Sequence, residues 1–228
     1  ASYRKALAGA DTVIACSKRN AADMAAVLHR TIDTIPCFSR AVAAPTGAKP
    51  APGAKLRFGY FGRLIPEKGI DLLCRLSEDP ACGAIAFHIW GEGPAYLASF
   101  FERYPNVHFH GAFRGKEALS KIVAELDAFL LLSVHPEGLP ISLLECMSGG
   151  LPWIATDRGG IPDIACEPLS TRVLAADVDV EAAKTAVLAL ADDLRAGRVT
   201  RDRQQALYRS RFAPDVLVRE WSQVLQLN

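Results

Sequence analysis

The sequence predicts an α/β protein built on a doubly wound parallel sheet, and two observations lead to this prediction. From residue 56 onward, short apolar runs typical of buried strands alternate with amphipathic segments typical of helices. Several of these strands run into glycine-containing turns just before the next helix. Strands that alternate with helices form parallel sheets with right-handed crossovers, so we expect helices on both faces of the sheet.

The alternation assigns strands and helices in order along the chain. Apolar, β-branched and aromatic residues mark the strands, whereas proline and glycine mark helix ends. Strands are expected at residues 56–62, 84–90, 107–110, 128–132, 151–155 and 171–174. Helices are expected at residues 69–76, 95–104, 116–124, 140–147, 161–165, 180–194, 201–211 and 214–225.

Before this alternating region the pattern is too short to form a domain. One strand over residues 11–17, a helix over residues 20–30 and an extended segment over residues 31–36 cannot enclose a core. Residues rich in alanine, proline and glycine follow without periodicity, which predicts a linker. We therefore divide the chain into an incomplete first unit (1–40), a linker (41–54), a main domain (55–212) and a final helical segment (213–228).

The composition is that of a globular protein with a substantial core. Half of the 228 residues are apolar, and 26 basic residues face 25 acidic ones, so the net charge of +1 gives no reason to expect a nucleic-acid partner. Six scattered cysteines without a CxxC pair favour free thiols in a reducing compartment. No apolar run reaches the roughly 18 residues of a membrane span, so we expect a cytoplasmic protein, with peripheral contact to the inner face of a membrane left open.

Two cations follow the first strand of the main domain. Gly62 ends the strand, Arg63 comes next, and Lys68 lies five positions after Arg63, just before a helix. A planar guanidinium suits phosphate oxygens, an ammonium adds a mobile charge, and a helix amino end adds unpaired N–H donors. The segment predicts phosphate recognition, with two solvated loop cations as the alternative.

Two glutamates frame the start of a later helix. Glu137 precedes the helix predicted over residues 140–147, and Glu145 lies inside it, eight positions after Glu137. At about 1.5 Å per residue their backbones would lie roughly 12 Å apart, too far for the carboxylate pair of a glycoside hydrolase, which needs about 5–9.5 Å. The spacing suits contacts with two ends of one elongated ligand. The alternative is a turn carboxylate and a solvated helix residue.

The residues between these glutamates are typical of a sharp entry into a helix. Gly138 lets the chain bend, and Pro140 has no N–H to lose in a first helical turn. The backbone N–H groups that follow, beginning at Ile141, lack partners inside the helix and can bind an anion.

Two further glycine turns follow predicted strands. The segment Gly91-Glu92-Gly93 has a GxG pattern without the third glycine of a dinucleotide fingerprint, so by itself it is a weak signal. Gly159 and Gly160 allow a backbone to approach a ligand closely, or form a tight turn alone.

Neither the histidines nor the arginine-rich helix predicts a separate site. The five histidines lack zinc-like spacing, and we expect no metal. The arginines between residues 195 and 211 predict a cationic helical face, which is either solvated or in contact with anionic lipid or a partner.

The motifs taken together resemble the retaining glycosyltransferases of family 4, which have the two-domain GT-B architecture. The resemblance covers roughly residues 10–226. Its carriers, in order, are Gly62-Arg63-Leu64 with Glu67-Lys68-Gly69, Gly91-x-Gly93-Pro94, Gly111, Ser133 with Glu137-Gly138 and Glu145-x-Met147-x-x-Gly150-x-Pro152, and Gly159-Gly160-x-Pro162.

The resemblance implies a Rossmann-like domain that binds a nucleotide-diphospho-sugar as substrate, without a cofactor. In this reading Arg63 and Lys68 hold the diphosphate and act in catalysis with Glu137, which contacts the donor sugar. Glu145 would contact the ribose. Further donor-binding residues implied by the resemblance are Gly62, Gly91, Gly111, Phe113, Gly138, Leu139, Pro140 and Ile141, with the loop from Gly111 to Phe113 near the base.

The resemblance also places the two ends of the chain. Residues 1–36 are similar to the last unit of the family's amino-terminal domain, and residues 214–225 to the helix that crosses back onto it. Asp163 stands where the family usually has glutamate. We therefore expect the donor-binding half of a glycosyltransferase, inactive in transfer by itself, with an acceptor that could be a glycan, a lipid or a small molecule. The alternatives are a non-catalytic sugar-nucleotide-binding module or partner subunit, or another GT-B enzyme such as an epimerase or a phosphorylase.

Overall fold

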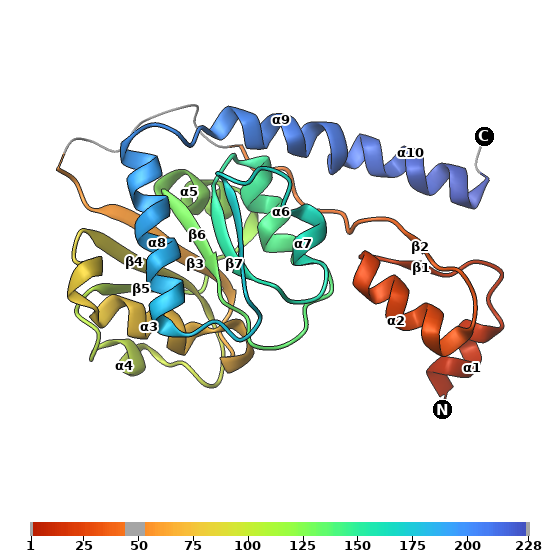
Figure 1. Ribbon diagram of the computed structural model, residues 1–228, viewed down its shortest axis with the longest axis horizontal. Coiled ribbons are helices and arrows are strands. Elements are labelled where there is room, and N and C mark those ends of the chain that lie inside the picture. Colours follow the sequence, from red (N-terminus) through yellow and green to blue (C-terminus); the bar gives the residue numbers. More distant parts are fainter. Residues whose placement is uncertain (1, 44–52, 227–228) are drawn as a thin grey trace.

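The computed structural model describes residues 2–43 and 53–226. Figure 1 shows a large α/β domain, a small amino-terminal unit beside it, and two helices that run from the domain toward that unit. The large domain contains a six-stranded sheet in which every paired strand is parallel to its neighbour. Its strands are β3 (Leu56–Arg63), β4 (Ile85–Glu92), β5 (Val107–Gly111), β6 (Ala128–Leu131), β7 (Trp153–Thr156) and β8 (Thr171–Leu174).

The strand order confirms the predicted doubly wound sheet. The order across the sheet is β5-β4-β3-β6-β7-β8. Strands β3, β4 and β5 therefore follow one another toward one edge of the sheet. The chain then crosses back to place β6 beside β3, and β7 and β8 follow toward the other edge. This is the Rossmann order, and its topological switch point lies between β3 and β6, where open α/β sheets bind ligands beyond the carboxyl ends of the strands.

Helices follow the strands as the sequence predicts. They are α3 (Ile70–Glu78), α4 (Ala98–Phe101), α5 (Gly115–Glu125), α6 (Ile141–Ser148), α7 (Ile161–Ile164), α8 (Val180–Arg195), α9 (Arg201–Arg211) and α10 (Pro214–Leu225), with short 3₁₀ turns at Pro66–Lys68 and Pro80–Cys82. The helix expected over residues 95–104 is much shorter, because Pro105 disfavours a helical Tyr104 and the residue that precedes α4, Leu97, forms no side-chain cap.

The core of the large domain lies against the sheet on both faces. Its largest fully buried side chains come from the central strands: Trp153, Phe58, Phe61, Phe87 and Phe129. Because these strands are covered on both sides by helices, their sequences are apolar throughout rather than alternating.

The amino-terminal unit is small and has its own apolar cluster. It consists of α1 (Ser2–Ala8), β1 (Ile14–Ala15), α2 (Lys18–Leu28) and β2 (Asp33–Thr34), with β1 and β2 paired in parallel. The sequence did not predict α1, and the strand expected over residues 11–17 is only two residues long. The linker prediction falls mostly on residues 44–52, which lie outside the described residues, as do residues 227–228 at the end of the chain.

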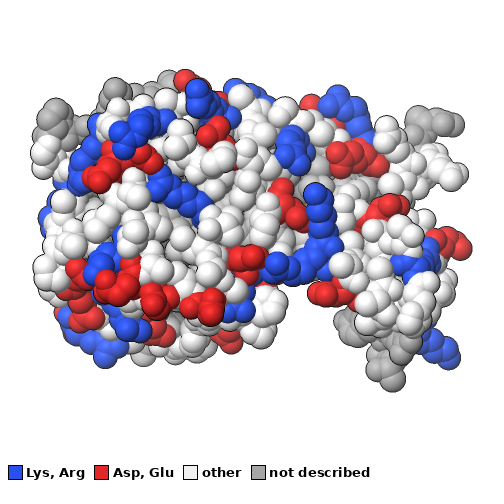
Figure 2. Space-filling view, viewed as in Figure 1, with Lys and Arg blue, Asp and Glu red and all other residues white. Residues whose placement is uncertain are grey.

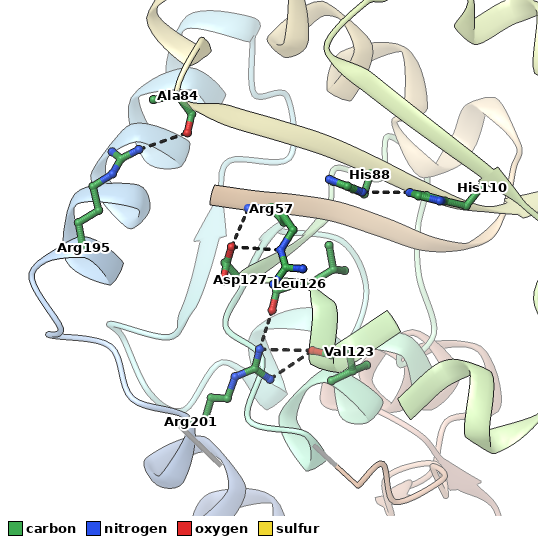
Figure 3. A network of polar contacts seen from close by, with 9 residues as sticks. All are labelled: Arg57, Ala84, His88, His110, Val123, Leu126, Asp127, Arg195 and Arg201. Carbon is green, nitrogen blue, oxygen red and sulfur yellow. Dashed lines mark hydrogen bonds and ion pairs between the residues drawn. The ribbon is translucent and has the colours of Figure 1, made fainter. Parts of the chain in front are cut away.

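Arg201 attaches α9 to the sheet domain. Its guanidinium donates hydrogen bonds to the carbonyl oxygens of Leu126 (2.5 Å), Val123 (3.2 and 3.3 Å) and Gly149 (3.1 Å), at the carboxyl ends of α5 and α6 (Figure 3). A cation is favourable there because it pairs with the unsatisfied carbonyls of a helix end. The predicted cationic face is therefore interrupted, since Arg201 points inward.

Candidate functional site

Strands β3 and β4 both extend further toward their carboxyl ends than the sequence predicts. β3 and β4 remain paired through Gly62 with Gly91 and Arg63 with Glu92, so Arg63 belongs to a strand rather than to a loop. The two glycines make this pairing possible, because a Cβ on Gly91 would lie 1.9 Å from the Gly62 carbonyl oxygen. The GxG pattern indicated a close backbone approach at Gly91, but it did not indicate which strand would approach.

A cleft of about 450 Å³ opens at the ends of these strands. Phe113 forms one wall and packs edge-on against Phe61, with ring centroids 6.2 Å apart. Gly111 lies just before this wall, with a left-handed φ of 74°. The cleft brings together four of the predicted residues, and its full lining is Gly62, Arg63, Gly91, Glu92, Gly93, Pro94, Ala112 and Phe113.

Lys68 and Glu137 form an ion pair across the switch point. The Lys68 ammonium lies 2.6 Å from one Glu137 carboxylate oxygen and 2.7 Å from the other. Ser133 donates a hydrogen bond of 2.5 Å to the same carboxylate. The side chains are mostly buried, with 21% of Lys68 and 11% of Glu137 exposed. The structure therefore joins two residues that the sequence had placed in separate motifs, and it adds Ser133, to which no role had been assigned.

Backbone contacts hold the loops that carry this pair. Gly69 adopts φ 73°, and a Cβ there would lie 1.9 Å from the Leu132 carbonyl oxygen. The Val134 N–H donates to the Glu67 carbonyl at 3.0 Å. Thr156 Oγ1 donates to the Ser133 carbonyl at 2.6 Å, so the end of β7 also supports the loop.

The Gly159–Gly160 turn packs directly against the Glu137 loop. A Cβ on Gly159, which has φ 56°, would lie 1.4 Å from the Glu137 carbonyl oxygen. The Gly160 N–H donates to the Gly138 carbonyl at 2.8 Å. The turn that the sequence left as either a ligand contact or a tight turn thus supports the backbone of a predicted site residue.

The residues at the start of α6 occupy different surroundings. Helix α6 begins at Ile141, one position later than expected, so Pro140 immediately precedes it. Gly138 and Ile141 are exposed. Leu139 is buried and lines a separate cavity of about 270 Å³ between the amino-terminal unit and the carboxy-terminal helices. Leu139 therefore does not line the 450 Å³ cleft.

Glu145 lies further along α6 in a partly buried position. Burial raises the pKa of its carboxyl to about 7, although the nearby Arg40 acts in the opposite direction. One turn later, Ser148 Oγ accepts a hydrogen bond of 2.9 Å from the Val42 N–H. Within the described residues, no hydrogen bond or ion pair joins the Glu145 carboxylate to the Lys68–Glu137 pair.

Neither a metal centre nor a membrane span is found in the described part of the chain. Among residues 2–43 and 53–226, no three or more His, Cys, Asp or Glu side chains are arranged to hold a metal ion. The three histidines of β4 and β5 gather on one face, where His88 Nδ1 and His110 Nε2 lie 3.0 Å apart (Figure 3). None of the described helices is both long enough and apolar enough to cross a bilayer.

Comparison with known families decides the identity of the fold. Residues 55–193, which include the cleft and the Lys68–Glu137 pair, match the family model of the group 1 glycosyl transferases. The chain belongs to this family. The motifs that carried the resemblance to family 4 and the GT-B fold are thereby confirmed as a group.

Curated relatives match about half of the chain. A GDP-mannose-dependent alpha-mannosyltransferase of Mycobacterium tuberculosis is 36% identical over 114 residues, which are 50% of this chain and 29% of the relative. The sulfoquinovosyl transferase SQD2 of Arabidopsis thaliana is 39% identical over 110 residues, 47% of this chain and 21% of the relative. The chain thus aligns with less than a third of the length of these group 1 glycosyltransferases.

Solved structures share the fold across nearly the whole chain. Sucrose-phosphate synthase from Thermosynechococcus elongatus superimposes with a TM-score of 0.82 at 18% identity, covering 98% of this chain and 60% of that one. Anabaena Alr3699/HepE in complex with UDP gives a TM-score of 0.78 at 16% identity, covering 95% of this chain and 64% of that one. The fold shared with these structures therefore extends to the small amino-terminal unit and the carboxy-terminal helices.

Proposed function

We propose that this chain is the donor-binding half of a retaining glycosyltransferase that moves a sugar from a nucleotide-diphospho-sugar to an acceptor. One observation carries the proposal: an open cleft ends at Arg63, and the Lys68–Glu137 pair spans the switch point between β3 and β6. Cations, a carboxylate and a helix amino end at that point suit a ligand with a base, a diphosphate and a sugar. GDP-mannose-dependent relatives and the UDP complex of a structural relative support this substrate class.

The proposed roles follow the order of the ligand's parts. The base lies in the cleft beside Phe113, and the diphosphate lies near Arg63, Lys68 and the amino end of α6. Glu137 accepts hydrogen bonds from the hydroxyls of the donor sugar, and Glu145 from those of the ribose. The cations stabilise the diphosphate as the bond to the sugar breaks, which needs no metal ion.

The acceptor half of the reaction is proposed to lie outside this chain. We expect attack from the face on which the diphosphate leaves, which retains the anomeric configuration, as the resemblance to family 4 implies. We propose that the residues that select the acceptor, whether a glycan, a lipid or a small molecule, belong to the amino-terminal domain of the family. We expect the 228-residue chain to bind donor weakly and to transfer no sugar.

Calorimetry on the folded chain tests this proposal. UDP-, GDP- and ADP-sugars are titrated separately, and we expect heat with the sugars of one base. Lys68→Met should weaken that binding about tenfold, because a charge-assisted contact to phosphate is lost. Lys116→Met, at an exposed position of α5, is the matched control. A folded wild-type chain that binds none of the three classes would overturn the proposal.

A further inference from the structure

The amino-terminal unit contacts the sheet domain through the first turn of α2. Figure 2 shows basic and acidic side chains next to one another where the small unit meets the large domain. Ser17 precedes α2 and accepts a hydrogen bond of 3.2 Å from the Asn20 N–H, as an N-cap residue does. The Lys18 N–H has no acceptor within α2, because it lies at the start of the helix. It donates a hydrogen bond of 2.6 Å to Asp163 Oδ2 instead. Asp163 follows Lys18 by 145 positions in the sequence, so a residue of the large domain completes the cap of α2.

The carboxylate of Asp163 is well suited to this position. An anion at the amino end of a helix is stabilised by the helix dipole, and its bond to the N–H is charge-assisted. A second pair, Arg19 with Asp157 at 3.0 Å, joins the same two segments. The side chains of that pair are 50% and 41% exposed, so solvent screening leaves it a small contribution. Asp163, in the short helix α7, and Asp157 therefore both link the first turn of α2 to the large domain, and only Asp163 bonds to the helix backbone.

The Gly159–Gly160 turn, which leads into α7, packs between the α2 cap and the Glu137 loop. A Cβ on Gly160 would lie 2.5 Å from the Ser17 Cβ and also 2.5 Å from the Gly138 carbonyl oxygen. The backbone of Gly160 is thus in contact with the α2 cap on one side and with the Glu137 loop on the other. Gly159 packs as closely against the Glu137 carbonyl. With no space between these groups, a shift of the α2 cap displaces the backbone that carries Glu137.

We propose that Asp163 is a positioning residue that couples the amino-terminal unit to the sugar end of the donor site. Asp163 does not touch the donor in this proposal. Its carboxylate holds the α2 cap, the cap packs against Gly160 through Ser17, and the Gly159–Gly160 turn packs against the Glu137 loop. The inference rests on the proposed function, since it assigns the donor sugar to Glu137. It goes further by making the orientation of the amino-terminal unit a determinant of how tightly the sugar is held. Coupling is reciprocal, so a sugar bound at Glu137 also stabilises the cap of α2.

The first arm of the test needs no ligand. Hydrogen exchange of the free chain should show protected amides at Lys18 and Gly160, and Asp163→Asn should speed the exchange of Lys18 about fivefold because the charge-assisted bond is weakened. Asp163→Glu keeps the carboxylate and should restore protection. Asp177→Asn, an exposed carboxylate of the same domain, is the control. Equal exchange in Asp163→Asn and wild type would overturn the capping role.

The second arm compares a nucleoside diphosphate with the matching nucleotide-sugar by calorimetry. We expect Asp163→Asn to bind the diphosphate with an affinity within twofold of wild type and to bind the nucleotide-sugar about fivefold more weakly. Asp163→Glu should bind the nucleotide-sugar as tightly as wild type. A general loss of structure would weaken both ligands equally, and that outcome, or no loss for either, overturns the coupling. A wild-type chain that binds neither ligand overturns the proposed function and with it the coupling, whereas the exchange arm still decides the capping role.

Discussion

Lys68 and Glu137 carry opposite charges and form an ion pair in the candidate site. Their oxygens and nitrogen lie 2.6–2.7 Å apart, and the pair is mostly shielded from solvent. A bound diphosphate would therefore meet a cation that already has a partner. Lys68 and the hydroxyls of a sugar would likewise compete for hydrogen bonds to the Glu137 carboxylate. With the roles proposed for Lys68 and Glu137, a ligand that has both a diphosphate and a sugar would satisfy both members of the pair, whereas either part alone would satisfy only one.

Replacing Glu137 with glutamine should separate these two contributions. We expect Glu137→Gln to bind a nucleoside diphosphate up to about fivefold more tightly, because Lys68 loses a competing anion, and to lose most of the added affinity that the sugar provides. Calorimetry with matched ligands measures both. Glu117→Gln on the exposed face of α5 is the control. Unchanged affinity for the diphosphate in Glu137→Gln would contradict this account of the pair.

Glu145 should make stability depend on pH near neutrality. Burial raises the pKa of its carboxyl in the folded chain to about 7, whereas the ordinary pKa of a glutamate carboxyl is 4.5. The folded state therefore holds the proton more tightly, and the free energy of unfolding should fall as pH rises from about 4.5 to 7. Glu145→Gln removes this titration, so its melting temperature should fall less between pH 5 and pH 8 than that of wild type. Glu125→Gln, at an exposed position, should behave as wild type, and an equal fall in Glu145→Gln would contradict the assignment.

The roles of single residues were only partly predictable. Glycines and cations next to strand ends predict a binding edge of the sheet, because glycine allows sharp turns and cations bind phosphate. Ser133 carried no such signal, since a serine in a loop has many uses and its contact with Glu137 depends on the loop's path. Leu139 lay within a predicted motif, yet it faces a different cavity. Side-chain direction in a loop is decided by packing rather than by spacing.

At the scale of elements, local patterns placed the strands and helices well but missed where some end. β3 and β4 extend past the predicted ends because Gly62 and Gly91 allow their backbones to stay paired. α4 is shorter because its pattern lacks a cap and meets Pro105. The residue range of α9 was predicted, but the helix has no strong apolar stripe to indicate which part of the domain it packs against. Arg201 attaches it to the carboxyl end of α5.

Arg201 should contribute more to stability than its neighbours on α9. Its guanidinium satisfies three carbonyls at two helix ends, and a lysine cannot reach all three. We expect Arg201→Lys to lower the free energy of unfolding by about 2–3 kcal/mol, because partly buried carbonyls lose their donors. Denaturant unfolding measures this, and Arg203→Lys, exposed on the same helix, should change it by less than about 0.5 kcal/mol. Equal effects at the two positions would contradict the anchoring role.

At the scale of the whole molecule, the two units differ greatly in the apolar surface they bury. The small unit has a cluster of four buried residues, Val13, Ala15, Ala21 and Ile32, whereas the sheet domain has a large continuous core. Figure 1 shows α10 extending from the sheet domain toward the small unit. The small unit is therefore stabilised largely by what it contacts, including the Asp163 cap of α2.

Native-state hydrogen exchange should resolve this difference. We expect the amides of α2 to open with a free energy at least about 2 kcal/mol below that of β3 and β4, because the small unit has few buried apolar contacts of its own. Phe58 and Phe87 provide reporter amides in the central strands, and Met24 and Ala25 in α2. Equal opening free energies in both parts would show that the chain unfolds as one cooperative unit instead.

The sequence by itself determined the α/β class, the parallel sheet, most strand and helix positions and the group of motifs that identifies the family. These follow from periodicity and from the local demands of turns, which act over a few residues. The tertiary structure decided that β3 and β6 are neighbours, which brings Lys68 to Glu137, and that the Gly159–Gly160 turn joins the α2 cap to the Glu137 loop. The Lys68–Glu137 and Lys18–Asp163 contacts join residues 69 and 145 positions apart, and their geometry depends on how the whole chain packs.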